Sequence, residues 1–251
     1  MFLFYRLLFA HIIADFPLQT RQIFRVKMNT QWGVILHTLI VLMFSILFAF
    51  PYLENPKVIA VLLIIFLSHT VIDKLKLKYF KKTNSRRLKI FIIDQVLHIS
   101  IIAILAFNFP EKILLNSPFN NVFLSNLIHL YNNDILYIKF TGYILSIYFI
   151  PILIMFVKEK KSSYNKQSTN QKTNNINMPV NTNIDKLYRI SLTLFAQYLA
   201  GRYLSLIFIL FIVISIILYK LKPDKIKKIY NLTNTINSSL ALFIGILLKF
   251  I

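Results

Sequence analysis

The sequence predicts an all-α fold: a polytopic integral membrane helical bundle with about eight transmembrane spans (six to eight). Three observations predict this. First, 57% of the 251 residues are hydrophobic and the mean hydropathy is +0.63, whereas soluble domains contain about 45–50% apolar residues. Second, several apolar runs are close to the roughly 20 residues that a helix needs to cross a bilayer core of about 30 Å. Third, most of the 29 Lys and Arg residues lie between these runs. We therefore expect a multi-pass protein of the bacterial cytoplasmic membrane.

The N-terminal part of the chain predicts four spans. Residues 1–16 form a short first span; Arg6 is its only early charge and no small-residue cleavage site follows, so we expect no cleavable signal peptide. A polar stretch with Arg21, Arg25 and Lys27 comes next. The following three spans are expected at 33–50, at about 57–73 and at 89–109.

The connection after the fourth span, 110–134, carries little net charge, and its apolar middle around 122–131 favours an interfacial helix. The fifth span is expected at 135–157. Pro151 predicts a kink within it, because proline cannot donate the backbone hydrogen bond of a continuous helix. The polar stretch that follows, 158–183, is rich in Asn, Lys, Ser and Gln and predicts a flexible linker.

The remaining apolar segments predict the last three spans. Residues 185–200 and 203–219 form a pair that is interrupted at Gly201 and Arg202, so they are either two short spans or one re-entrant hairpin. The final span is expected at about 236–250. The predicted organisation is therefore a four-helix membrane unit at 1–109, a connection with the fifth span at 110–157, the linker at 158–183, and C-terminal membrane helices at 184–251.

The charges of the connections test this count of spans. Basic segments surround 21–27, 74–89, 158–172 and 220–228, whereas 51–56, 110–134 and 201–202 are weakly charged. With eight spans, every basic segment falls on one side of the membrane and every weakly charged segment on the other. Because cytoplasmic loops are enriched in Lys and Arg, the basic segments are predicted to be cytoplasmic and both termini to lie outside.

Composition also excludes several classes of function. The chain has no cysteine, which excludes disulfides, thiolate metal sites and cysteine nucleophiles. The net charge of +20 could indicate nucleic-acid binding, but the positive-inside rule explains it better. We therefore expect membrane lipids as partners and no nucleic acid; protein partners stay unknown. The sequence contains no Gly-rich phosphate loop, GxSxG elbow or HExxH motif.

Ionisable residues interrupt the first four apolar runs. Ionisable groups at membrane depth cost roughly 2.5–3.5 kcal/mol each and tend to face a bundle interior and mark function. Three pairs share one spacing, His-xxx-Asp or its reverse, which places both side chains on one helix face. The seven residues are His11, Asp15, His37, His69, Asp73, Asp94 and His98.

The predicted topology places these seven residues at one depth. Given a rise of about 1.5 Å per residue, all of them lie within roughly 15 Å of the cytoplasmic face. Gln19, Lys74 and Gln95 border the same layer. His129 and Asp134 fall on the opposite side and are expected at the surface.

Neutral imidazoles and carboxylates are suitable ligands for Zn, Mn or Fe. Seven candidate ligands exceed the four of one tetrahedral ion, so the set allows for two ions, as in hydrolases that hold both the attacking and the leaving oxygen. Two alternatives remain open. The set can form a proton or ion pathway, or it can tie helices together by charge-assisted hydrogen bonds without a metal.

The string from His11 to Thr20, HIIADFPLQT, resembles the opening signature of a bacterial membrane family known as domain of unknown function 3307. The resemblance continues through His37, the segment 69–74 and the segment 94–98, and covers about residues 1–100. The C-terminal half resembles the family more loosely, with Tyr188 where a Leu-Glu-Arg motif would have its acid. The resemblance implies a membrane location and supports the polar set, but it implies no reaction. The arrangement is also similar to that of membrane-bound metal-dependent hydrolases, by analogy alone.

The function predicted from the sequence is thus an integral membrane protein with an intramembrane His/Asp metal site near the cytoplasmic face. The predicted activity is that of a metal-dependent hydrolase, in which a metal-bound water attacks a lipid-like phosphoester or amide and a spare Asp or His acts as general base. The alternatives are a proton- or ion-coupled transporter and a non-enzymatic membrane accessory protein. An off-centre cluster counts against a carrier, because carriers usually place such sites near the midplane.

Overall fold

The computed structural model describes residues 2–82, 87–109, 111–115, 122–156, 189–190, 193–194 and 232–248. All regular structure within these ranges is helical. The contacts divide the chain into two compact units. The described residues up to Thr141, together with Phe156, belong to the first unit, and Gly142–Met155 with the described residues from 189 onward belong to the second.

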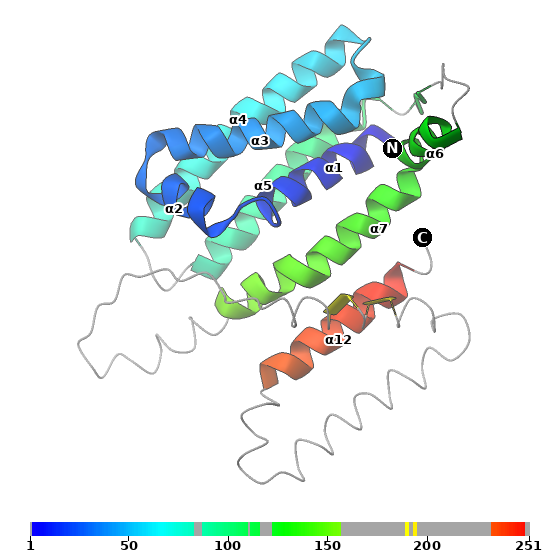
Figure 1. The fold of residues 1–251 in the computed structure, drawn as a ribbon. Helices are drawn as coiled ribbons and strands as arrows, with labels where there is room; N and C mark the ends of the chain where they lie inside the picture. The colour runs from blue at the N-terminus through cyan, green and yellow to red at the C-terminus, as the bar shows by residue number, and fades with distance from the viewer. Residues whose placement is uncertain are drawn as a thin grey trace, which may run out of the picture. The chain divides into compact units, whose positions relative to one another are not determined.

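Four helices of the first unit form a bundle (Figure 1). Helix α1 packs against α3 and α5, α3 also packs against α4, and α4 against α5, so the four contacts close into a ring. A short helix, α2, packs against the start of α3. The helices are α1 (Phe2–Asp15), α2 (Arg21–Asn29), α3 (Gln31–Ala49), α4 (Pro56–Lys82) and α5 (Arg87–Ala106).

The bundle has an apolar end and a polar end. The apolar core joins the first half of α1, the last residues of α3, the first half of α4 and the last residues of α5. The remaining parts of the same four helices carry the seven His and Asp residues. This division follows from the alternating direction of the helices, because each polar segment lies at the same end of the bundle. The core residues are Leu3, Leu7, Ala49, Tyr52, Val58, Val61, Leu62, Ile65, Ile102 and Ala106.

Two segments are more helical than the sequence analysis expected. Helix α4 continues through the first part of the basic segment to Lys82, well beyond the predicted end of the span near residue 73. Lysine is a good helix former and its long stem allows the amine to reach water from a helix that starts in the membrane. The polar stretch after α1 is also helical: Thr20 accepts a hydrogen bond from the backbone N–H of Ile23 and so caps α2.

The connection after α5 contains α6 (Val122–Tyr131), at the position where an interfacial helix was predicted. Helix α7 (Asp134–Ile144) follows and leads into a π-helical segment, η2 (Leu145–Phe149), directly before the predicted kink at Pro151. The second unit also contains α12 (Leu232–Leu247), which overlaps most of the predicted last span. The predicted linker at 158–183 lies outside the described residues.

Four helices in the described part of the chain are long and apolar enough to cross a membrane: Trp32–Tyr52, Pro56–Phe80, Arg87–Ala106 and Asp134–Phe156. They match the second to fifth predicted spans and indicate a membrane protein. The total of about eight spans is not confirmed. Helix α1 has 14 residues, or about 21 Å at 1.5 Å per residue, and only residues 189–190 and 193–194 of the predicted sixth and seventh spans are described.

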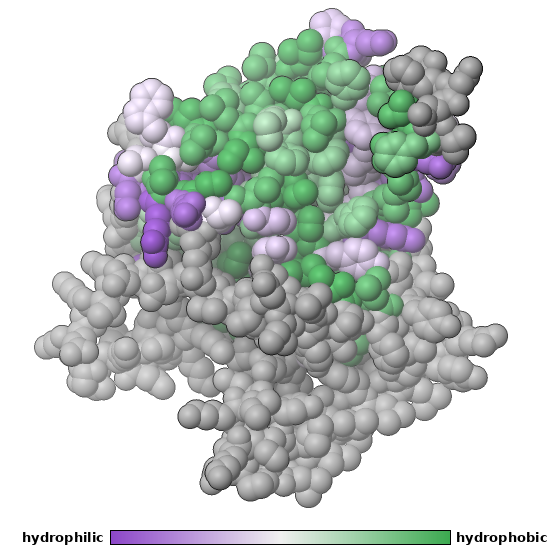
Figure 2. Space-filling view, in the orientation of Figure 1, coloured by the Kyte–Doolittle hydropathy of each residue, from purple (hydrophilic) through white to green (hydrophobic). Residues whose placement is uncertain are grey.

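The outer surface of the bundle helices is apolar. Figure 2 shows hydrophobic residues across much of the described face, with hydrophilic residues gathered near α2. Large side chains such as Met43, Leu67, Val71, Ile93 and Ile104 are more than half exposed. A soluble protein rarely exposes so much contiguous apolar surface, so this surface is suited to contact with lipid.

Candidate metal centre

The polar end of the bundle brings together all seven His and Asp residues singled out in the sequence. Helix α1 contributes His11 and Asp15, α3 contributes His37, α4 contributes His69 and Asp73, and α5 contributes Asp94 and His98. Each of the seven side chains is buried, and none belongs to a residue more than 6% exposed. Three groups of them bring ligand atoms close enough to hold a metal ion: His11, Asp15 and His69; His37, His69 and Asp73; and Asp15, Asp94 and His98.

The closest contacts lie between α1, α3 and α4. The Nε2 atom of His37 lies 3.1 Å from Asp15 Oδ1 and 3.4 Å from His69 Nε2, and His69 Nε2 lies 3.5 Å from the same Asp15 oxygen. The same two imidazoles also approach Asp73, whose Oδ2 lies 3.7 Å from His37 Nε2 and 3.5 Å from His69 Nε2. The structure therefore contains two triangles of nitrogen and oxygen atoms that share the His37–His69 edge.

The size of these triangles matches metal coordination. Four N or O ligands placed tetrahedrally at 2.0–2.1 Å from zinc are separated from one another by roughly 3.3 Å. The sides of both triangles, 3.1–3.7 Å, are close to this value. Each triangle thus has the dimensions of one face of a tetrahedral site, and the preferred atoms of such sites.

A second group of residues surrounds the other oxygen of Asp15. Gln95 Nε2 donates a hydrogen bond to Asp15 Oδ2 at 3.1 Å and one to Asp94 Oδ2 at 3.0 Å. His11 Nε2 lies 3.8 Å from Asp15 Oδ2, and His98 Nδ1 lies 3.8 Å from Asp94 Oδ1. Asp15 therefore faces both groups of residues, with one carboxylate oxygen toward each.

Several nitrogen and oxygen atoms of the cluster have no hydrogen-bond partner among the described residues. They are both ring nitrogens of His11 and of His98, Nδ1 of His37, and Oδ1 of Asp73 and of Asp94. An unsatisfied buried polar group costs about 1–3 kcal/mol, so a cluster with this many is expected to have a further partner. A coordinated cation would satisfy such atoms without needing a donor from the protein.

Two lysines that the sequence analysis did not select also belong to this site. Lys27 Nζ lies 2.6 Å from Asp73 Oδ2, and Lys76 Nζ lies 2.5 Å from Asp94 Oδ2. Lys27 is only 3% exposed, although it lies on a short amphipathic helix. Lys76 could have been identified, because it follows His69 and Asp73 at positions i+7 and i+3 and so shares their helix face. The sequence of α2 gives no comparable indication for Lys27.

The three residues predicted to border the cluster lie in three different environments. Gln95 bridges two of the carboxylates, and Gln19 accepts a hydrogen bond from Lys27 Nζ at 3.3 Å. Lys74 is exposed on α4 and lines a neighbouring pocket instead.

A separate buried ion pair lies at the apolar end of the first unit. Arg6 is fully buried; its Nε donates to Asp134 Oδ1 at 3.0 Å, and its guanidinium also lies over the rings of Tyr131 and Tyr137. The expectation that Asp134 lies at the surface is therefore wrong: it is 6% exposed because it pairs with Arg6. His129 is exposed on α6, as expected.

One family model matches the part of the chain that contains the cluster. A family model described as "Protein of unknown function (DUF3307)" matches residues 3–125. The match includes α1 to α5 and all seven His and Asp residues. Neither the curated proteins nor the solved structures contain a match to the chain. Residues 3–125, with the buried cluster, therefore belong to the DUF3307 family.

Proposed function

We propose that this chain is a multi-pass membrane protein that binds a divalent metal ion in its His/Asp cluster and acts as a metal-dependent hydrolase. The observation that carries the proposal is the size of the two triangles at Asp15, His37, His69 and Asp73, whose sides of 3.1–3.7 Å suit direct coordination. The unpaired buried atoms of His11, His98 and Asp94 support it.

The charges of the site favour one ion over two. Lys27 and Lys76 each neutralise one carboxylate, those of Asp73 and Asp94. Asp15 then carries the one remaining negative charge of the cluster. One dication would change the net charge of the buried site from about −1 to about +1, whereas two would leave about +3, which is far more costly away from water. We therefore place one ion per chain, at the Asp15, His37 and His69 atoms.

The residues have distinct roles in the proposed reaction. A bound divalent ion supplies a water of lowered pKa and polarises a carbonyl or phosphoryl oxygen. The imidazoles of His11 and His98, whose ring nitrogens have no hydrogen-bond partner within the described residues, would accept the proton of the attacking water. Gln95 would hold the carboxylates of Asp15 and Asp94 in place through its two hydrogen bonds.

Elemental analysis of the purified full-length protein tests the proposal. We expect about one equivalent of Zn, Mn or Fe per chain in the wild type, and a loss of about tenfold or more in His69→Ala, because His69 belongs to both triangles. His129→Ala is the matched control: His129 is exposed on α6, so its replacement should leave the metal content unchanged.

Wild-type protein without stoichiometric metal would contradict the proposal. If His69→Ala then lowers the melting temperature of a metal-free protein, the cluster ties the helices together instead. If the metal-free protein supports proton flux in proteoliposomes that depends on His69 and Asp73, the cluster is a proton pathway.

A further inference from the structure

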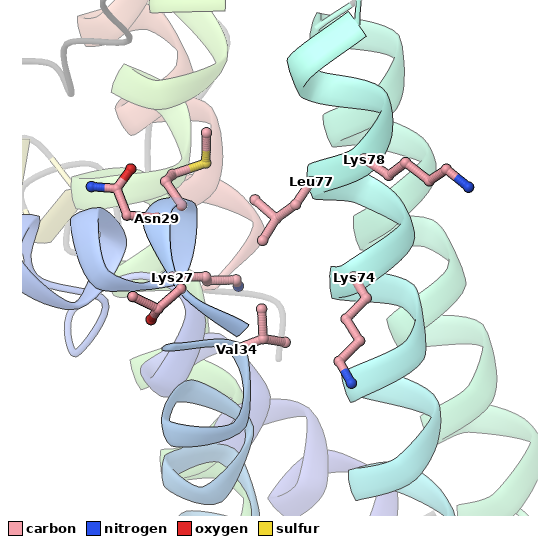
Figure 3. Close-up of a pocket in the computed structure, with 8 residues that line it drawn as sticks. Lys27, Asn29, Val34, Lys74, Leu77 and Lys78 are labelled. Carbon is pink, nitrogen blue, oxygen red and sulfur yellow. The ribbon is translucent and has the colours of Figure 1, made fainter. Parts of the chain in front are cut away.

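A pocket of about 590 Å³ lies beside the cluster, between α2, the start of α3 and the basic half of α4. Figure 3 shows Leu77 pointing from α4 toward α2, and Lys27 extending from α2 toward the gap. Lys74 and Lys78 line the α4 side, and Val34 of α3 forms part of the inner wall. The pocket is large enough for a phosphate group with its substituents.

The lining residues give this pocket a positive charge. Three of the lining side chains are lysines, and none is acidic. Lys27 is paired with Asp73 deeper in the bundle, whereas Lys74 and Lys78 are exposed. In Figure 3 the side chain of Lys78 extends away from α2. Both exposed lysines have flexible stems and would turn their ammonium groups toward a dianion such as a phosphate monoester, for which lysine is a common ligand as a point charge.

One residue of the pocket, Lys27, also contacts the cluster. Lys27 lines the pocket and its Nζ lies 2.6 Å from Asp73 Oδ2. Lys74 is the next residue after Asp73, and Val34 precedes His37 by about one helical turn. A group bound between Lys74 and Lys78 would thus lie close to the end of the cluster at which Asp73 and His37 are found.

An exposed apolar stripe on α4 leads toward the same place. Leu67, Val71 and Leu75 are 60%, 56% and 50% exposed and follow one another at intervals of four residues, so they share one helix face. In a membrane-spanning helix such a stripe contacts acyl chains. It ends next to the two exposed lysines of the pocket.

We infer that this pocket binds the phosphate group of an amphiphile, whose hydrocarbon part lies along the apolar face of α4. This inference rests on the proposed function and names its substrate class: a phosphate-bearing lipid presented to the metal site from the basic end of the bundle. The pocket holds the headgroup by charge, and Lys27 links the occupied pocket to Asp73.

Binding to the purified full-length protein in neutral detergent tests this inference. The probes are inorganic phosphate, dihexanoyl phosphatidic acid and, as a zwitterionic comparison, dihexanoyl phosphatidylcholine. We expect phosphatidic acid to bind the wild type at least about tenfold more tightly than phosphatidylcholine. The double variant Lys74→Gln, Lys78→Gln should weaken phosphatidic acid binding by about tenfold or more, with unchanged metal content.

Lys57→Gln is the matched control, since it removes one exposed charge from the other end of α4 and does not line the pocket. It should leave both affinities unchanged. The three exposed lysines can be replaced without disturbing buried contacts, and circular dichroism checks that each variant is folded.

The remaining outcomes are distinct. If the protein binds phosphatidic acid but does not bind inorganic phosphate, the inference is supported and the lipid tail is required for binding. Binding of inorganic phosphate alone would assign the pocket to free phosphate and overturn the amphiphile. Equal binding of both lipids, or no effect of the double variant, would overturn the inference. If His69→Ala abolishes phosphate binding and the double variant does not, phosphate binds at the metal; the pocket is then excluded and the proposed function stands.

Discussion

At the scale of single residues, Asp15 is the centre of the candidate site. Its Oδ1 faces His37 and His69, and its Oδ2 faces His11 and accepts a hydrogen bond from Gln95. Unlike Asp73 and Asp94, it has no lysine within ion-pair distance among the described residues. Its charge is therefore the one that no described lysine neutralises, and under the proposed function it would be the strongest metal ligand of the three.

Replacing Asp15 by Asn tests this role of its charge. The amide keeps the size of the side chain and can still hydrogen-bond, but it removes the negative charge that a cation needs. We expect the metal content of Asp15→Asn, measured by elemental analysis, to be lower than that of the wild type by about tenfold or more. Size-exclusion chromatography should still show a folded protein.

Asp134→Asn is the matched control, because it changes a second buried carboxylate that lies at the other end of the bundle. It leaves Arg6 as a buried charge with a weakened partner, so it should lower the free energy of unfolding by up to about 3–5 kcal/mol without loss of metal. Equal metal loss in both variants would show that metal content reports folding and would contradict the special role of Asp15.

Single residues of the site could be predicted where their side chains are unusual for an apolar sequence. The seven His and Asp residues could be identified because ionisable side chains are rare in apolar runs, and the structure places all seven in one cluster. Lys27 and Lys76 escaped identification because lysines near the ends of spans are common for reasons of topology alone. Their partners, Asp73 and Asp94, become evident only when the helices are packed together.

At the scale of elements, the corner between α2 and α3 positions one wall of the site. A Cβ atom on Gly33 would overlap the backbone of Val26, so glycine is required for the close approach of the two helices. Thr30 stabilises the corner: its Oγ1 accepts a hydrogen bond from Gly33 N at 3.0 Å. This corner fixes α2 so that Lys27 reaches Asp73.

Gly33→Ala should therefore disturb both the fold and the site. We expect a loss of about 1–3 kcal/mol in the free energy of unfolding, the usual cost of overpacking, measured by thermal unfolding in detergent. Gly142→Ala is a graded control, since the three atoms nearest to a Cβ there, at 2.7–3.0 Å, belong to the side chain of Leu248 and not to the backbone. If both substitutions cost the same, or if Gly33→Ala costs nothing, the close α2–α3 approach is not required.

The long apolar helices were predictable because a membrane span needs a run of apolar residues, and the second to fifth predicted spans are such helices. The helix α2 and the far end of α4 were not predictable in this way, because neither the polar stretch after α1 nor the basic segment after residue 73 belongs to an apolar run. Lys and Arg favour helix almost as much as Leu does, so α4 runs on to Lys82. This extension places Lys74, Lys76 and Lys78 on the same helix as His69 and Asp73.

At the scale of the whole molecule, the proposed orientation in the membrane decides which compartment reaches the site. Helix α4 has 27 residues, or about 40 Å at 1.5 Å per residue, enough to cross the bilayer and extend beyond it. Its two ends differ in charge: Glu54 and Lys57 offset each other at its start, whereas Lys74, Lys76 and Lys78 lie in its second half, together with the cluster and the pocket. The positive-inside rule predicts that the basic end is cytoplasmic.

The absence of cysteine makes this orientation directly measurable, since any single cysteine introduced is the only thiol in the chain. Glu54 and Lys78 are both exposed and flank the apolar part of α4. A membrane-impermeant maleimide should label Glu54→Cys in intact cells and Lys78→Cys only in inverted vesicles, and the cysteine-free parent shows the background. Labelling of Lys78→Cys in intact cells would place the cluster on the outer face and reverse the topology. Labelling of both positions from one side would mean that α4 does not cross the membrane.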